Sequence, residues 1–295
     1  MHRKPFTTAI LCLGISLIIL TASHADSTIS PANPFSYGAN VGWVNNKHDQ
    51  PSAPGGLVVS EFTVSGYAYG VNIGWIFFGA SSPANGVRYT NVAADTGVNH
   101  DGSGNFSGYA YSANAGWISF GWAGTGSPDR PRISLATGAF SGYAYGANIG
   151  WLNLATLTTA SIAAPDTDGD GIADAWETEH FGNLTTADAT SDNDGDGASD
   201  CAEYQAMTDP ADGQSYFRIV SQTINAGMTN ATIVFTSRSS RRYRLQWTPD
   251  LTTWLTDSSL GIFSADPGPT TTRTINFPTG AKRFFRAVSV LPLQN

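Results

Sequence analysis

Hydrophobic and polar positions alternate with a period of two in four similar stretches within residues 26–160. Each stretch holds a Tyr-rich run, then Asn, one further residue, Gly and Trp, and then a second run with the same period. A period of two is typical of a strand with one buried face, and Asn and Gly favour the turn between two strands. The sequence therefore predicts a four-copy β-repeat domain over residues 26–160, within a chain that is mainly β.

Shorter β-type runs precede each of the later three copies of the motif. They cover residues 57–59, 87–89 and 132–135 and contain Val, Leu, Ile or Tyr. Such residues are enriched in strands, so we expect each run to add a strand to its repeat.

The residues after each motif tryptophan indicate which strand face is buried. In the last three copies, the first and third residues after the Trp are large and apolar, whereas the second is mostly polar. The apolar positions are Ile76 and Phe78, Ile118 and Phe120, and Leu152 and Leu154. The tryptophan shares its face with the polar neighbour, so we expect it at a partly wet rim.

Two interpretations of the repeat aromatics remain open from the sequence. Tyr and Trp could pack between adjacent repeats, or Trp75, Trp117 and Trp151 could form stacking platforms for the sugar rings of glycans. The copies resemble Ser-Gly-Tyr-Ala…Asn-x-Gly-Trp-Ile repeats of large bacterial surface proteins. That resemblance implies a location at the cell surface more than an activity.

A second alternating pattern, over residues 214–295, predicts a C-terminal β-sandwich module. The apolar series Tyr243, Leu245 and Trp247 alternates with polar residues, which indicates one buried and one wet face. We expect strands at 219–220, 231–236, 242–247, 253–255, 273–277 and 284–290. Tyr-x-Leu-Gln-Trp-x-x-Asp-Leu-x-x-Trp and a terminal Arg-Phe-Phe-Arg resemble a fibronectin-like module of exported bacterial proteins.

Six arginines of this module have two possible roles. They could line solvated strand faces that discourage edge pairing, or they could contact an acidic polymer or components of the cell envelope. They are Arg238, Arg241, Arg242, Arg244, Arg283 and Arg286.

Residues 1–25 have the pattern of a signal peptide. A basic start is followed by an apolar run from Ala9 to Leu20 and by small residues up to Ala25. The run is too short for a permanent membrane anchor, so we expect cleavage after Ala25. The mature chain should not span the membrane and should be secreted, as an extracellular or cell-surface protein.

Charge is concentrated in one segment, 161–213, between the two β regions. The chain carries a net charge of −8, and residues 166–212 hold 14 of its 23 acidic residues and no Lys or Arg. A general acidic surface for solubility would be more evenly spread. The net negative charge of an exported chain also argues against a nucleic-acid partner.

The acidic segment contains two stretches of 12 residues, Asp166–Glu177 and Asp192–Glu203, that fit the calcium-loop pattern at every position. In that pattern carboxylates stand at positions one, three, five, nine and twelve, and Gly at position six allows a sharp turn. Position seven, here Ile172 and Ala198, offers its backbone carbonyl. The sequence predicts two calcium ions (Ca2+) that order the segment.

The flanks of the loops differ from those of a regular EF-hand. Pro165 argues against a helix before the first loop, whereas helices are expected after the loops, from Ala175 to a cap at Gly182 and over 200–207. Trp176 and Tyr204 should pack these two helices together. The unit resembles thrombospondin type 3 and dockerin-like calcium repeats, although Glu at position twelve and Asp at position three depart from dockerins. The resemblance implies two ligand sets: Asp166, Asp168, Asp170, Asp174 and Glu177, and Asp192, Asp194, Asp196, Asp200 and Glu203.

Catalytic chemistry finds little support in the sequence. Three histidines and Cys201 remain outside the signal, no hydrolase or phosphate-binding motif is present, and Glu61 is the one Glu outside the acidic segment. Pairing Glu61 with an Asp to form a glycosidase dyad has no support from spacing. We expect a non-enzymatic, secreted or cell-surface calcium-binding protein for display or adhesion; the alternative is a carbohydrate-binding protein that uses the repeat aromatics.

Overall fold

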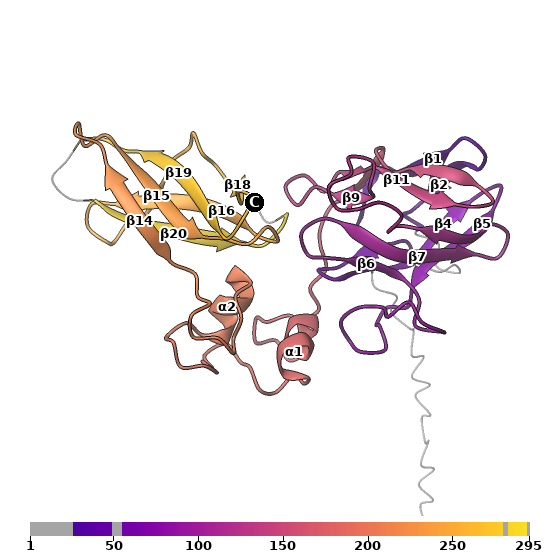
Figure 1. Ribbon diagram of the computed structural model, residues 1–295, viewed down its shortest axis with the longest axis horizontal. Coiled ribbons are helices and arrows are strands. Elements are labelled where there is room, and N and C mark those ends of the chain that lie inside the picture. The colour runs from indigo at the N-terminus through magenta and orange to yellow at the C-terminus, as the bar shows by residue number, and fades with distance from the viewer. Residues whose placement is uncertain (1–25, 49–54, 280–282, 294–295) are drawn as a thin grey trace, which may run out of the picture.

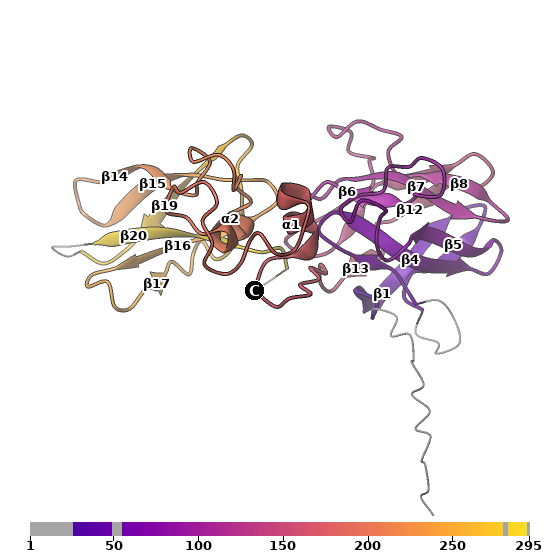
Figure 2. The same ribbon diagram turned by 90° about the horizontal axis from the view of Figure 1, so that it is seen from below.

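The computed structural model describes residues 26–48, 55–279 and 283–293. Strands dominate these residues, and the two helices lie in the segment between two β units, as Figures 1 and 2 show. The mainly β fold is therefore confirmed. The expected signal peptide, residues 1–25, lies outside the described residues. No helix in the described part of the chain has the length and apolar character needed to cross a membrane.

Thirteen strands lie in the described residues of the N-terminal β unit. They are β1 (Ile29–Gly38), β2 (Gly42–Asn45), β3 (Val58–Val59), β4 (Thr63–Gly70), β5 (Gly74–Gly79), β6 (Val98–His100), β7 (Phe106–Ser112), β8 (Gly116–Ser119), β9 (Arg132–Ile133), β10 (Phe140–Ser141), β11 (Tyr143–Gly146), β12 (Gly150–Asn153) and β13 (Leu157–Thr159).

Each motif copy forms one antiparallel hairpin, and the four hairpins close into a ring. The hairpins are β1–β2, β4–β5, β7–β8 and β11–β12, and each pairs with the next. β1 also pairs with β12, where Tyr37 lies opposite Asn153, so the first hairpin meets the last. This closure leaves no free sheet edge among these strands.

The motif asparagines join neighbouring hairpins instead of shaping their own turns. Their side-chain amides donate to the backbone carbonyls of Ile149, Val41, Ile73 and Ala115, respectively, at 3.0–3.2 Å; the donors are Asn40, Asn72, Asn114 and Asn148. The positive φ of each turn, between 72° and 76°, belongs to the motif glycine. The Asn-x-Gly spacing thus encodes a contact between repeats as well as a turn.

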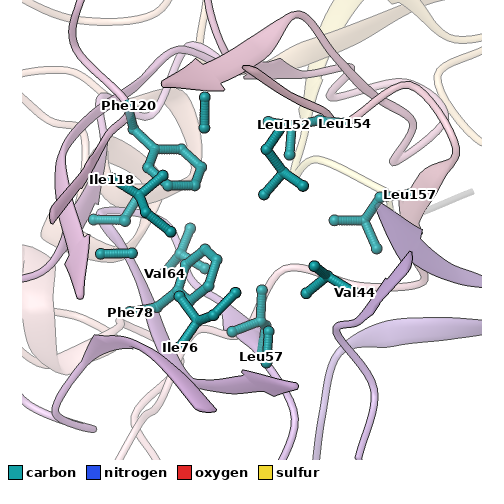
Figure 3. Packing of buried hydrophobic residues seen from close by; sticks show 14 of the residues in the cluster. Val44, Leu57, Val64, Ile76, Phe78, Ile118, Phe120, Leu152, Leu154 and Leu157 are labelled. Carbon is teal, nitrogen blue, oxygen red and sulfur yellow. The ribbon is translucent and has the colours of Figure 1, made fainter. Parts of the chain in front are cut away.

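The interior of the ring is an apolar core. Every hairpin sends its period-two side chains inward, and Val44, Ile76, Ile118 and Leu152 are almost completely buried. Figure 3 shows these residues converging on one centre together with Phe78, Phe120 and Leu154. The predicted inward positions after the tryptophans are therefore confirmed.

One of the three expected short strands does not form. Strands β3 and β9 lie within the runs 57–59 and 132–135, but residues 87–89 are not a strand. The side chain of Asn99 accepts from the backbone N–H of Tyr89 and donates to its carbonyl, at 2.9 and 2.8 Å. The Asn99 side chain therefore satisfies the backbone of Tyr89 in place of a neighbouring strand. The strand that pairs with β4 and β7 here is β6.

The acidic segment contains α1 (Asp174–Phe181) and α2 (Asp200–Ala206). Gly182 caps α1 in the left-handed conformation, as expected from the sequence, and Met207 does the same for α2. The rings of Trp176 and Tyr204 meet edge to face at 5.7 Å within a small buried cluster. The predicted packing of the two helices through these residues is confirmed.

The C-terminal unit has two sheets around one apolar core. One sheet contains β14 (Ile219–Ile224), β15 (Asn230–Thr236) and β19 (Thr270–Asn276); the other contains β16 (Arg242–Thr248), β17 (Leu255–Thr256), β18 (Phe263–Ser264) and β20 (Phe284–Val290). Side chains from both sheets, including Phe235, Leu245 and Ile275, form its core. All six expected strands have a counterpart, and β18 is additional.

Candidate metal centre

The first acidic loop is held in a tight curl by its own carboxylates. Asp166 accepts hydrogen bonds from the backbone N–H groups of Gly169 and Gly171, at 2.7 and 3.0 Å. Both glycines have positive φ, which residues with a side chain rarely adopt. Asp170 accepts from the N–H of Ile172 at 2.8 Å. The chain therefore wraps around the position-one carboxylate.

The second loop repeats this arrangement at equivalent positions. Asp192 accepts from the N–H groups of Gly195 and Gly197, at 2.8 and 3.0 Å. Asp196 accepts from the N–H of Ala198 at 2.7 Å. Two separate stretches with the same sequence pattern thus reach the same geometry, which supports a shared purpose.

Each loop gathers three carboxylates at one point. One ligand atom from each member of a triad lies within 4.8 Å of the others; the triads are Asp166, Asp168 and Asp170, and Asp192, Asp194 and Asp196. Such a cluster of oxygens suits a hard divalent cation such as calcium. The structure thereby brings together the residues predicted at positions one, three and five.

The glutamates at position twelve supply the strongest sign that a cation is needed. The side chain of Glu177 is completely buried, and neither of its carboxylate oxygens has a hydrogen-bond partner within the described residues. In Glu203, Oε1 accepts from Thr208 at 2.9 Å, while the buried Oε2 has no hydrogen-bond partner in the part of the chain that the structure describes. An unpaired buried carboxylate is costly, so these oxygens fit a metal that neutralises them.

Three aspartate oxygens in the loops are also buried and unpaired within the described residues. Oδ2 of Asp170, Asp194 and Asp196 is buried and finds no hydrogen-bond partner among the residues described. Each of the three belongs to a triad, so the unpaired atoms point to the same two centres as the position-twelve glutamates. The donor set in each loop therefore fits calcium.

The electrostatics of the loops agree with this fit. Burial, reinforced by the charges of Asp170 and Asp168, raises the pKa of Glu177 from 4.5 to about 7. Burial, opposed by the hydrogen bond from Thr208, likewise raises the pKa of Glu203 to about 7. Both carboxyls therefore ionise at a higher pH than an ordinary glutamate, and a nearby positive charge would favour their ionised form.

The remaining predicted ligands occupy other places in the loops. Asp174, at position nine, accepts from the N–H and the hydroxyl of Thr167, at 2.7 and 2.6 Å. Asp200 accepts from the hydroxyl of Ser191 at 2.5 Å and from the N–H of Asn193 at 3.2 Å. These two carboxylates lie outside the triads and fasten each helix to the start of its loop. The side chain of Ile172 packs into the buried cluster beneath the first loop.

The repeat aromatics lie on the outer wall of the ring. Trp43, Trp117 and Trp151 are 56%, 54% and 48% exposed, which agrees with the predicted wet rim, and Trp75 is partly buried. Each tryptophan contacts a tyrosine of its own hairpin at 4.7–5.0 Å between ring centroids. The rings therefore pack mainly within a hairpin and not between adjacent repeats.

A buried polar junction was not foreseen from the sequence. Arg241, Tyr204 and Glu61 are 2%, 3% and 7% exposed, and they come from the C-terminal unit, α2 and the N-terminal unit, respectively. Glu61 accepts a hydrogen bond from the Tyr204 hydroxyl at 3.1 Å and pairs with Arg241 at 3.2 Å. Arg241 also donates to the carbonyls of Tyr204 and Gln205, at 2.8 and 3.1 Å.

For Arg241, this junction contradicts both roles that the sequence suggested for the arginines of the C-terminal module. Its guanidinium is neither a solvated strand face nor free for an acidic polymer, because it is buried against the other two parts of the chain. It also gives Glu61 an ion-pair partner in Arg241. The sole local signal was an isolated Glu in a nearly neutral region.

Comparison with known families supports the assignment of the acidic segment. The family model of the bacterial TSP3 repeat matches residues 166–182 and 192–213. That repeat is a structural calcium-binding module of extracellular proteins. No curated protein and no solved structure matches the chain. The thrombospondin type 3 resemblance is thus confirmed, and it covers the segment that carries both loops.

Proposed function

We propose that the protein is a calcium-dependent connector that holds two β units in a fixed arrangement outside the cell, for display or adhesion. The match to the TSP3 repeat supports a calcium-binding extracellular protein. The observation that carries the finer proposal is the position of Glu203. This residue lies in α2 directly before Tyr204, whose hydroxyl and carbonyl bond to Glu61 and Arg241.

The ligand sets proposed for the two sites follow the loops. The first is Asp166, Asp168, Asp170, Asp174, Glu177 and the carbonyl of Ile172; the second is Asp192, Asp194, Asp196, Asp200, Glu203 and the carbonyl of Ala198. Bound calcium would supply the positive charge that these clustered carboxylates lack. Asp174 and Asp200 begin the helices, so a loop that is ordered by its ligands also orders the helix that follows.

The order of α2 determines the junction between the units. Tyr204 and Gln205 present backbone carbonyls to Arg241, and Ser289 donates to the carbonyl of Gln205 at 2.7 Å. On the other side, Arg88 of the N-terminal unit pairs with Glu179 of α1. Both β units are therefore attached to the helices that follow the loops.

Calorimetric titration of the calcium-free full chain tests the sites. We expect two ions per chain, and we expect Glu177→Gln and Glu203→Gln each to remove one of them. Asp212→Asn, which changes an exposed carboxylate outside both loops, is the matched control and should retain both. A chain that releases no heat on calcium addition would contradict the calcium assignment.

Hydrogen exchange with and without calcium tests the connector. We expect calcium to increase the protection of amides in α2 and at Arg241, and Glu203→Gln to abolish that increase while the ring strands keep their protection. Equal protection of α2 with and without calcium would contradict the connector proposal without contradicting the calcium sites.

A second candidate function is carbohydrate binding by the outer wall of the ring. The half-exposed faces of Trp117 and Trp151 favour it, since sugar rings stack on such surfaces. A glycan array that compares the full chain with Trp75→Ala, Trp117→Ala and Trp151→Ala tests this idea. Binding that persists in all three variants, or that is absent from the parent chain, would exclude these side chains as platforms.

A further inference from the structure

A pocket on the outer wall distinguishes the fourth hairpin from the other three. It has a volume of about 280 Å³ and is lined by Trp122, Asp129, Tyr143 and Trp151. Tyr143 and Trp151 come from β11 and β12, whereas Trp122 and Asp129 come from the loop that follows β8. None of these residues takes part in the calcium loops or in the junction of the units.

Three aromatic rings form the walls of this pocket at steep angles. Trp122 and Trp151 meet at 63° with 4.6 Å between ring centroids, and Tyr143 stands at 74° to Trp151 with 6.4 Å between centroids. The three side chains are between about a third and a half exposed. A compact group in this corner would contact more than one aromatic ring.

The loop that supplies Trp122 and Asp129 is fixed by hydrogen bonds. The indole N–H of Trp122 donates to the carbonyl of Tyr143 at 2.6 Å, and the N–H of Tyr143 donates to the carbonyl of Asp129 at 2.9 Å. Arg130 anchors the loop from behind by donating to the carbonyls of Ala123 and Phe106, at 2.7 and 2.8 Å. The pocket is thus formed in advance, which lowers the entropic cost of binding.

The other hairpins lack this combination. In the second hairpin, His48 takes the place of Trp122 against Trp75, at 4.9 Å between centroids. In the third hairpin, the rings found against Trp117 among the described residues are Tyr109 and Tyr111 of its own hairpin. A general packing role for the aromatics therefore does not explain why the fourth hairpin acquires a second tryptophan and a carboxylate.

The charges around the pocket select the ligand class. Aromatic faces carry negative electrostatic potential and attract cations, and quaternary ammonium groups are recognised by such cages. Asp129 adds a full negative charge, and its exposed carboxylate has no hydrogen-bond or ion-pair partner among the described residues. The guanidinium of Arg130 is directed to backbone carbonyls, and no cation is among the lining residues.

We propose that the pocket formed by Trp122, Asp129, Tyr143 and Trp151 binds a quaternary or highly methylated ammonium group. A saccharide is neutral, so it would leave the carboxylate of Asp129 without a counter-charge. An ammonium group needs π-faces and a counter-charge, and the pocket supplies both. The ligand could be a free solute or the headgroup of a choline lipid, since the recognised chemistry is the same.

Titration of the full chain with choline, followed by tryptophan fluorescence and by the indole N–H resonances, tests this site. We expect saturable binding with a dissociation constant of about 1 mM. The neutral isostere 3,3-dimethylbutan-1-ol, which has the same shape without the charge, should bind about tenfold more weakly. Vesicles of phosphatidylcholine then distinguish the two sources of the ligand. If the ligand is a lipid headgroup, the chain should bind the vesicles and this binding should depend on Trp122. If the ligand is a free solute, the chain should not bind the vesicles.

Substitutions in the pocket complete the design. Trp122→Ala should weaken choline binding by about tenfold and Asp129→Asn by about fivefold. Trp117→Ala, which removes an exposed tryptophan of the third hairpin that does not line the pocket, is the control and should leave the affinity unchanged. Equal binding of the neutral isostere, or binding of glucose or cellobiose in place of choline, would overturn the proposal, as would an Asp129→Asn variant with the parent affinity.

Discussion

At the scale of single residues, the Gly of the Ser-Gly-Tyr motif has a role that its sequence context does not reveal. Gly108 has a φ of +80°, and a Cβ atom at this position would overlap the carbonyl oxygen of Gly97. The strand bends here so that β7 pairs with β6 on one side and with β8 on the other. The residue is therefore required twice, for its backbone conformation and for its lack of a side chain.

Gly108→Ala should consequently destabilise the N-terminal unit by more than about 2 kcal/mol, since backbone strain and steric overlap add. Gly124→Ala is the matched control, because Gly124 has open space around it and no positive φ; it should change stability by less than about 0.5 kcal/mol. Thermal unfolding of the two variants provides the comparison. Equal melting temperatures would show that the bend tolerates a side chain.

At the scale of elements, each acidic loop and its helix bury one glutamate whose pKa is raised. Burial is the main cause that raises the pKa of Glu177 and of Glu203 to about 7 in the metal-free chain. The ordinary value is 4.5, so protonation favours the folded, metal-free segment. This contribution to stability is complete below about pH 4.5 and is lost as the pH rises through about 7.

Calcium should therefore stabilise the segment more at higher pH, because calcium requires the ionised carboxylates and competes with protons for them. We expect a small increase in the melting temperature on calcium addition at about pH 5.5 and a larger one at about pH 8. Scanning calorimetry at both pH values measures it. In the double variant Glu177→Gln, Glu203→Gln this pH dependence near neutrality should disappear; its persistence would assign the titration to other groups.

At the scale of the whole molecule, one buried ion pair joins parts of the chain that are far apart in sequence. Arg241 and Glu61 belong to different β units, and Tyr204 lies between them in α2. A buried charge whose partner is removed is strongly destabilising, whereas removal of both charges costs much less. The junction is therefore specific: it fits one arrangement of the three parts.

Arg241→Met should lower the stability of the junction by about 3–5 kcal/mol, because it leaves the Glu61 carboxylate buried without its partner. Adding Glu61→Gln to this variant should restore part of the loss. Arg218→Met, at an exposed position of the C-terminal unit, serves as the control. Hydrogen exchange at α2 and small-angle scattering report the loss and any separation of the units; unchanged values for Arg241→Met would show that the pair does not hold them.

The sequence alone determined the features that depend on neighbours within a few residues. The period-two pattern placed the hairpins and their inward side chains, since alternation directly reports which face of a strand is buried. The acidic loops were readable for the same reason: their carboxylates and glycines lie within 12 consecutive positions, and each helix begins inside its loop. The cap at Gly182 followed from that local order, whereas the contact between Trp176 and Tyr204 was expected because aromatic side chains on two neighbouring helices tend to be buried together.

Only the tertiary structure decided the features that depend on which distant segments meet. Closure of the ring joins Asn40 to Ile149, 109 residues later, and the junction joins Glu61 to Tyr204, 143 residues later. The pocket likewise needs a loop residue, Trp122, to settle against Trp151. Period-two patterns are the same whichever strands pair, so the choice of partner depends on how the whole chain packs, and the sequence pattern does not record it.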